Sequence, residues 1–358
     1  MGRAVFGWKA VRPVALAAAL IALTAPAGGG GTGPLRLEAP YPAPHQLGSF
    51  RDSSAALARR RLETVSWWGG NYIASTGEPV RVNVSSAYPE DEAVARGWAE
   101  FFAGLVHGSE LALAEAFLAP QHEVVRLCGE GALGCYRNQM LVSIGDSEAG
   151  VAPALVAAHE YGHHVAYNRI NPPWTAIDWG TKRWASASGI CGRAVTRAVF
   201  PGDEGDNYRL NPGEGFAEAY RVLNDVRRGA TAFEWPIVDA SFFPDAKART
   251  AIEEDVLRPW TAPTAGSARG RLAPGKKRTW SLPLSTPLDG ELAVTLRMAA
   301  DATHDLSLVD ANGTRLAGGL WSRTGEKTLR YTVCGERALR IRVAGGGPSR
   351  FAVRWTRP

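Results

Sequence analysis

Apolar and polar residues alternate with two different periods along the first two-thirds of the chain. Val80 to Ser85 alternates with period two and predicts a strand, and the apolar run from Gln139 to Gly145 predicts another. Helical patterns cover Pro89 to His107, which starts with acidic residues, and Ala152 to Tyr167, which is followed by Pro172-Pro173. Strands and helices that are mixed in this way predict an α+β fold.

Four more elements are predicted between and after these: a helix over Ser109–Leu118, a strand over Glu123–Leu127, and helices over Glu214–Val226 and Asp245–Leu257. The intervening segment 168–212 is rich in Trp, Gly and Pro and is expected to be a long irregular loop. Loops of this length in compact domains usually carry function.

The pattern changes after Pro259. Residues 261–277 are rich in Pro, Gly, Ala and Arg and are predicted to form a linker. Short alternating runs follow, separated by turns such as Asp310-Ala-Asn-Gly313, and they predict a small antiparallel β-sandwich over residues 278–358. The apolar positions of these runs are Leu292, Val294, Leu296 and Met298, then Leu306 and Leu308, then Leu329, Tyr331 and Val333, then Leu339, Ile341 and Val343, and finally Phe351, Val353 and Trp355.

The first 27 residues have the features of a secretory signal peptide. Arg3, Lys9 and Arg12 precede an apolar run from Val14 to Thr24, and Ala25-Pro-Ala27 is a small-residue cleavage site. The apolar run is shorter than the roughly 20 residues that cross a bilayer, so no stable membrane span is expected after processing. We therefore predict a secreted protein, with an uncleaved anchor as the alternative.

Segment 28–50 is rich in Gly and Pro and is predicted to be a flexible spacer. A propeptide role for residues 28–70 stays open, although no cysteine lies there to act as a switch. The chain has 358 residues, of which 45% are hydrophobic and 21% charged, and this composition favours two globular domains over disorder. The α+β domain is predicted to cover residues 51–260, ahead of the linker and the sandwich.

Charge and cysteine content narrow the function classes. The net charge is +5, and it falls to +2 without the three basic residues of the signal peptide, so the total charge does not indicate nucleic-acid binding. Four cysteines in an exported chain predict two disulfides. Cys128 and Cys135 bracket a Gly-rich loop and form the preferred local pair, which leaves Cys191 with Cys334. Three pairings are formally open, and the absence of a C-x-x-C spacing disfavours a zinc site made of cysteines.

The predicted helix over Ala152–Tyr167 contains the sequence His159-Glu160-Tyr-Gly-His163. Residues four apart on a helix lie on one face, so both imidazoles can reach a single Zn²⁺ ion. Glu160 would lie beside the open coordination position, where it could take a proton from the attacking water and pass it to the leaving amine. His164 is turned by about 100° from this face and is not expected to be a ligand.

A third ligand would define the type of site. The metzincin pattern requires Gly at position 166 and His at position 169, but the chain has Ala166 and Arg169, so that class is excluded. A carboxylate from a later helix is the other common solution. Glu214 and Glu218 are four residues apart and share a helical face. One of them would bind the metal, and the other could orient a histidine ligand from behind.

The motif around His159 and His163, followed by the run Glu-x-Phe-Ala-Glu-Ala-Tyr-Arg that ends at Arg221, resembles the gluzincin metallopeptidases. It is most similar to the catalytic domain of anthrax-type lethal factor and its bacterial relatives. This resemblance implies a zincin-like metallopeptidase domain with Zn²⁺ as cofactor, Glu214 as the third ligand and Glu218 outside the ligand set. It also implies that Tyr208, six residues before Glu214, stabilises the oxyanion, although Pro212-Gly213 departs from the family pattern.

The expected function is therefore that of a secreted zinc metallopeptidase acting on a protein or peptide, which would add as a strand beside Gln139–Gly145. The C-terminal sandwich is similar to accessory domains of secreted bacterial peptidases, and this implies that it binds a surface or the substrate. Two alternatives stay open: a non-catalytic binding or adhesion protein with a peptidase-like fold, and a peptidoglycan-directed amide hydrolase.

Overall fold

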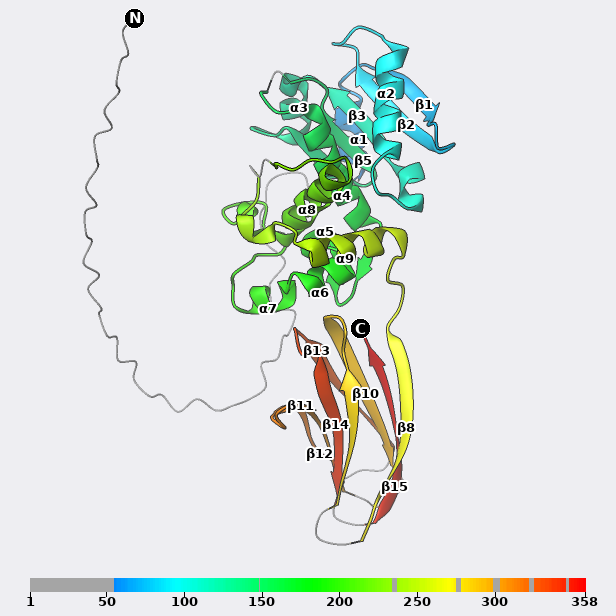
Figure 1. The fold of residues 1–358 in the computed structure, drawn as a ribbon, viewed down its shortest axis with the longest axis vertical. Coiled ribbons are helices and arrows are strands. Elements are labelled where there is room, and N and C mark those ends of the chain that lie inside the picture. The colour runs from blue at the N-terminus through cyan, green and yellow to red at the C-terminus, as the bar shows by residue number, and fades with distance from the viewer. Residues whose placement is uncertain are drawn as a thin grey trace, which may run out of the picture. The chain divides into compact units, whose positions relative to one another are not determined.

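The structure is a computed structural model that describes residues 55–147, 149–233, 237–274, 278–298, 303–321, 325–345 and 348–358. The described residues mix helices and strands in an α+β arrangement, and the C-terminal part forms several sheets (Figure 1). The predicted signal peptide (1–27) and spacer (28–50) lie outside the described residues. No helix among the described residues is long and apolar enough to cross a membrane.

A five-stranded sheet with the strand order β1-β2-β3-β5-β4 organises the N-terminal part. Its strands are β1 (Trp67–Ile73), β2 (Pro79–Ser85), β3 (Glu115–Ala119), β4 (Gly134–Arg137) and β5 (Met140–Ile144). The two outer pairs, β1 with β2 and β4 with β5, are antiparallel, whereas β3 is parallel to both of its neighbours. The strand β4 is therefore an edge of the sheet, and β5 lies one strand inside it.

Helices cover this sheet and continue after it. They are α1 (Ala55–Leu62), α2 (Glu92–Ala103), α3 (Gln121–Cys128), α4 (Pro153–Tyr167), α5 (Ala176–Trp179), α6 (Lys182–Ala187), α7 (Ile190–Val195), α8 (Pro212–Arg227) and α9 (Ala246–Leu257), with single 3₁₀ turns at Ser109–Leu113, Tyr208–Leu210 and Ala240–Phe242. Helix α4 is buried from Val156 to Ala166 because it lies between β5 and α8. The large side chains Tyr161, Phe216 and Tyr220 are fully buried at this junction and form the centre of the core.

Two elements were predicted with the wrong secondary structure. The predicted helix Ser109–Leu118 is a 3₁₀ turn followed by strand β3, and the predicted strand Glu123–Leu127 is helix α3. Strand β3 is buried on both faces, so its apolar run lacks the alternation that identifies a strand. Helix α3 begins after Pro120, and Val124, Leu127 and Cys128 share its buried face at helical spacing.

The segment 168–212 is folded rather than irregular, which corrects the expectation of a long loop. It contains a two-stranded hairpin, helices α5 to α7 and the 3₁₀ turn at Tyr208–Leu210. Trp184 is fully buried, and the rings of Trp174 and Trp179 stack with centroids 4.6 Å apart. The tryptophans thus supply the apolar surface that short helices need in order to pack. The helices were not predicted because the segment is rich in Gly and Pro.

The C-terminal part consists of two four-stranded antiparallel sheets, in the orders β13-β10-β15-β8 and β12-β11-β14-β9 (Figure 1). The strands are β8 (Thr264–Leu272), β9 (Thr279–Ser285), β10 (Gly290–Met298), β11 (His304–Asp310), β12 (Arg315–Trp321), β13 (Gly325–Val333), β14 (Ala338–Gly345) and β15 (Ser349–Arg357). Residues from both sheets form one apolar cluster that includes Leu292, Leu308, Ile341 and Val353.

The predicted linker at 261–277 is wrong over most of its length, because Thr264–Leu272 forms strand β8 and pairs with β15. The inward positions of β8 include Gly266 and Gly270, which lie directly opposite Trp355 and Phe351. A Cβ atom at Gly266 would lie 2.4 Å from the Trp355 ring, so the aromatic side chains of β15 occupy the space that larger residues of β8 would fill. The sequence of such a strand lacks the alternating hydrophobic pattern by which strands are predicted.

Both preferred disulfide pairs are present in the structure, Cys128–Cys135 and Cys191–Cys334. The first joins the end of α3 to strand β4 across the Gly-rich loop. The second has a sequence separation of 143 residues and covalently links the helical region to the β-sandwich region. Disulfides of this kind are typical of proteins that fold in an oxidising compartment.

Candidate metal centre

Helix α4 brings His159 and His163 to the same face, as their spacing predicts. Their rings lie 4.9 Å apart between centroids, and both side chains are buried together with Glu160. Helix α8 crosses beside this face and contributes Glu214 from its first turn. Its start is fixed by Asn211, whose side chain accepts a hydrogen bond from the Gly213 amide, and by Pro212 in the first helical turn.

The carboxylate of Glu214 is where the side chains converge. Its Oε2 atom lies 3.2 Å from His159 Nε2 and 3.3 Å from His163 Nε2. The potential ligand atoms of these three residues all lie within 4.8 Å of one another. The Tyr208 hydroxyl donates a hydrogen bond to the same Glu214 oxygen at 2.8 Å. Tyr208 therefore lies at the site, as expected, and contacts the carboxylate directly.

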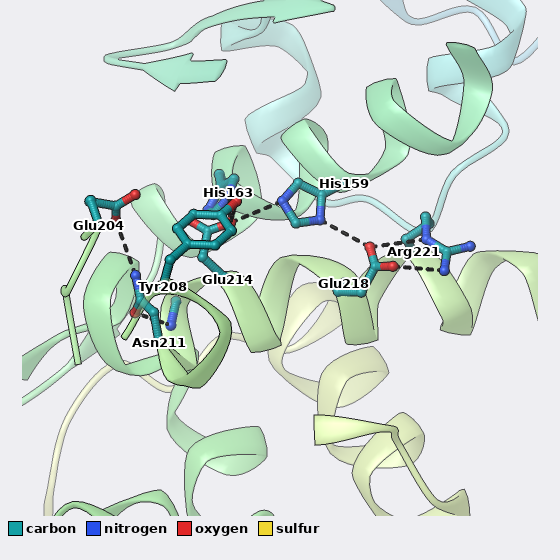
Figure 2. A network of polar contacts seen from close by, with 9 residues as sticks. His159, His163, Glu204, Tyr208, Asn211, Glu214, Glu218 and Arg221 are labelled. Carbon is teal, nitrogen blue, oxygen red and sulfur yellow. Dashed lines mark hydrogen bonds and ion pairs between the residues drawn. The ribbon is translucent and has the colours of Figure 1, made fainter. Parts of the chain in front are cut away.

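Glu218 lies behind His159 rather than among the converging atoms (Figure 2). Its Oε2 atom is 3.0 Å from His159 Nδ1, and Arg221 donates to both of its oxygens at 3.0 and 2.8 Å. Arg221 also donates to Asp225 at 2.5 Å, and it is buried. An Nδ1 proton held by Glu218 leaves the Nε2 lone pair of His159 facing Glu214, which is the tautomer that a metal ligand needs.

The close approach of α4 and α8 depends on Gly162. A Cβ atom at this position would lie 2.6 Å from Ala217 Cα and 2.8 Å from the Ala217 carbonyl oxygen. Both are backbone atoms, so neither can rotate away. Gly162 therefore sets the distance between the helix that carries the histidines and the helix that carries Glu214.

We expect Gly162→Ala to lower the free energy of unfolding by about 1–3 kcal/mol, because it forces two packed backbones apart. It should also weaken the binding of a metal ion added to the three residues, since Glu214 moves away from the histidines. Urea unfolding and zinc titration measure the two effects. Gly97→Ala is the matched control: Gly97 is exposed in α2 with open space around its Cβ position, so alanine should stabilise the helix by up to about 1 kcal/mol. Equal stability of the two variants would contradict this role of Gly162.

A cleft of about 870 Å³ opens onto these residues. Its lining includes the Gly-rich loop, strand β4, Tyr208 and Ile237. Glu160 lines the cleft, and no described residue forms a hydrogen bond with its carboxylate. Gly134 of β4 leaves room for this group, because a Cβ atom there would lie 2.6 Å from Glu160 Oε1.

Burial and charge give the acidic groups different pKa values. Burial raises the pKa of Glu160 to about 7, although His159 and His163 oppose the shift. Burial also disfavours the charged form of Glu214, but the adjacent His163 and His159 outweigh it and hold the pKa of Glu214 well below its usual range. Burial and the nearby Glu214 keep the pKa of Tyr208 well above 10, so its phenol remains a hydrogen-bond donor. The two carboxylates therefore differ in their readiness to accept a proton.

The donor atoms fit a divalent transition metal. Two imidazole nitrogens and one carboxylate oxygen form the ligand set of many catalytic zinc sites. Burial alone would lower the pKa of His159, yet its hydrogen bonds to Glu214 and Glu218 raise it to about 10, which means that these carboxylates favour positive charge at this point. A cation bound between the three residues would take the place of the protons that they share.

The structure corrects one detail of the predicted site and adds others. The strand Gln139–Gly145 corresponds to β5, which is flanked on both sides, so the open edge beside the cleft belongs to β4 instead. His164 is a core residue whose Nε2 atom lies 2.7 Å from the Glu110 carbonyl oxygen. Asn211 and Arg221 are site residues for which the sequence predicted no role. The Asn-Pro pair ahead of a helix and an arginine three residues after Glu218 were the available signals.

No family model matches the chain, and no curated protein matches it. Among solved structures it is similar to a mitogen derived from Yersinia pseudotuberculosis, with 12% identity over 27% of this chain and 87% of that chain and a TM-score of 0.21. It is also similar to the SPBc2 prophage-derived protein YomS, with 12% identity over 27% of this chain and 98% of that chain (TM-score 0.19). A family GH115 4-O-methyl-alpha-glucuronidase has 9% identity over 70% of this chain and 42% of that chain (TM-score 0.20). Likenesses this weak carry no inference about fold or function.

Proposed function

We propose that this protein is an exported zinc metallopeptidase of the gluzincin type, with a zincin-like domain that contains His159, His163 and Glu214 as metal ligands. The observation that carries the proposal is the convergence of two imidazole nitrogens and a buried carboxylate beside Glu160, whose carboxylate faces the cleft. The two disulfides fit export, as does the apolar N-terminal segment with its cleavage site.

Each residue at the site has a distinct chemical task. A bound zinc ion supplies Lewis acidity, which makes water nucleophilic near neutral pH. Glu160 accepts the proton of the attacking water and delivers it to the leaving amine, a task suited to a carboxyl whose pKa is about 7. Tyr208 holds a protonated phenol 2.8 Å from Glu214 Oε2. On exchanging this hydrogen bond, the phenol would donate instead to the oxygen that becomes negative as the carbonyl is attacked.

A peptide is the substrate class that this cleft favours. Strand β4 presents an open edge along the cleft, and an extended peptide could add to it through main-chain hydrogen bonds. The disulfide Cys128–Cys135 ties this strand to α3 and fixes the loop that forms one wall. Main-chain binding of this kind holds the scissile bond near Glu160 without selecting particular side chains.

Metal removal tests the proposal. The mature chain, incubated with a peptide library and followed by mass spectrometry, is expected to cleave internal peptide bonds. Chelation should reduce cleavage to background, because the nucleophile loses its activation, and added Zn²⁺ should restore it. Cleavage that survives complete metal removal would contradict the proposal. So would a zinc-loaded chain that cleaves no library peptide, casein or cell-wall peptide, and this second outcome would favour a binding protein.

A further inference from the structure

Charge is divided unevenly along the chain. Residues 264–358 contain 16 Lys and Arg and 7 Asp and Glu, which gives a net charge of +9. Residues 28–263 contain 21 Lys and Arg and 28 Asp and Glu, a net charge of −7. The small total charge of the protein therefore conceals a strongly basic β-sandwich, and asymmetry of this kind often accompanies binding to a charged partner.

Six exposed arginines project from one face of the sheet β13-β10-β15-β8. Arg330 on β13 forms an ion pair with Glu291 on β10, and we call the other five the arginine face. It consists of Arg269 and Arg271 on β8, Arg297 on β10, and Arg350 and Arg354 on β15. Side chains alternate between the two faces of a strand, and the neighbouring positions, such as Phe351 and Val353, are buried in the sandwich core. All five arginine side chains therefore project from the same outer surface of the sheet.

Strand register places these arginines around Ala352. Arg269 lies directly opposite Ala352 on one side, and Arg297 lies opposite it on the other. Arg350 and Arg354 precede and follow Ala352 by two residues along β15, about 6.8 Å away on the same face. Neighbouring strands are about 4.8 Å apart, so the set forms a flat ring of positive charge with a small residue at its centre.

Repulsion among the clustered arginines destabilises the free protein. Among the described residues no carboxylate forms an ion pair with any of the five arginines, although the exposed Glu326 on β13 lies directly opposite Arg297. On the same face Arg330 pairs with Glu291, and in the other sheet Arg315 pairs with Asp305. Arg271 and Arg350 even occupy directly opposite positions on adjacent strands, where like charges destabilise the sheet. Five guanidinium groups that share one face and form no ion pair with a described carboxylate indicate a partner outside the molecule.

We infer that the arginine face binds a linear anionic polysaccharide through its carboxylate or sulfate groups. The planar guanidinium group donates two parallel hydrogen bonds to such an oxyanion, and repeated acidic groups along a flexible polymer can meet several arginines at once. This binding anchors the exported protein on a polymer that surrounds the cell. It is independent of the proposed hydrolysis, because none of its residues belongs to the metal centre.

The surroundings of the arginines favour a polysaccharide over other polyanions. On β8, β10 and β15, the other outward positions carry Ala, Ser and Thr apart from Glu291. Proteins that bind single-stranded nucleic acids usually supply aromatic side chains on which bases stack, and the outward positions of these three strands have none. Large apolar side chains, which strengthen peripheral membrane binding by entering the bilayer, are also missing from the same positions.

Chromatography and titration with heparin, used as a model sulfated polysaccharide, test the inference on the full mature chain. The double variant Arg269→Thr with Arg354→Thr removes two charges from the arginine face. Arg340→Thr with Arg342→Thr is the matched control, because it removes two exposed arginines from β14 in the other sheet. We expect the first variant to bind heparin about tenfold more weakly and to elute at lower salt, and the control to stay within about twofold of wild type.

A third variant, Arg269→Lys with Arg354→Lys, keeps the charge and should recover most of the heparin affinity, which separates loss of binding from misfolding. Equal losses in the two threonine variants would mean that only overall charge matters, and this would overturn the arginine face as a site. Tighter binding of wild type to a single-stranded oligonucleotide or to phosphatidylserine vesicles than to heparin would overturn the polysaccharide assignment.

Discussion

Glu160→Gln is expected to lower the hydrolytic rate by roughly 10²- to 10⁴-fold while the protein keeps its zinc. Glu160 is buried at the cleft, its carboxylate is free of hydrogen bonds from the described residues, and it lies outside the convergent ligand set. Glutamine has the same shape but cannot accept the proton of the attacking water. The measurement is the initial rate of peptide cleavage, with zinc content determined on the same samples.

The control for this experiment is Glu130→Ala, which removes another cleft-lining glutamate at an exposed position of the Gly-rich loop. It should leave the rate within a few-fold of wild type. If Glu160→Gln and Glu130→Ala had the same activity, Glu160 would not be the base. If Glu160→Gln lost its zinc, the residue would belong to the ligand set, contrary to the geometry.

The second large effect is expected for Glu214→Ala, which should abolish tight zinc binding. Glu214 supplies the only carboxylate oxygen that faces both histidine Nε2 atoms among the described residues. Its removal also leaves two buried imidazoles without the negative charge that favours a cation beside them. The loss should exceed the roughly 10- to 100-fold that follows when an outer hydrogen-bond partner of a ligand is removed. Competition with a zinc chelator of known affinity measures it.

Glu218→Gln provides the comparison that separates the two glutamates. Because Glu218 contacts the Nδ1 atom of His159 and not the Nε2 atoms, this variant should lose only about 10- to 100-fold in zinc affinity. If Glu218→Gln bound zinc more weakly than Glu214→Ala, Glu218 would be the metal ligand and Glu214 the supporting residue. Both variants should keep the far-UV circular dichroism spectrum of wild type, which shows that the overall secondary structure is retained.

Helical geometry accounts for how much of the site could be predicted. His159 and His163 on α4, and Glu214 and Glu218 on α8, needed only the four-residue spacing to be placed on common faces. Which glutamate faces the histidines could not be read from that spacing, because the angle at which α8 crosses α4 depends on packing around Gly162 and Ala217. The resemblance to gluzincins selected Glu214, and the structure places that residue beside both Nε2 atoms.

Strands were harder to predict where their hydrophobic pattern depends on which other elements pack against them. Strand β3 has no alternation because both of its faces are buried, and β8 has little hydrophobicity because Trp355 and Phe351 fill the space above its glycines. The arginine face could not be predicted from the sequence for a related reason. Its residues are spread from Arg269 to Arg354, and they meet only after three strands pair in register.

The most direct test of the metal centre is X-ray absorption at the zinc edge on the purified mature chain. We predict one zinc per molecule with nitrogen and oxygen ligands at about 2.0–2.2 Å, including two imidazoles, and no sulfur. The imidazole signal should decrease in a His163→Ala variant. Sulfur ligands at about 2.3 Å, or a purified chain that holds no zinc after incubation with the metal, would contradict the proposed site.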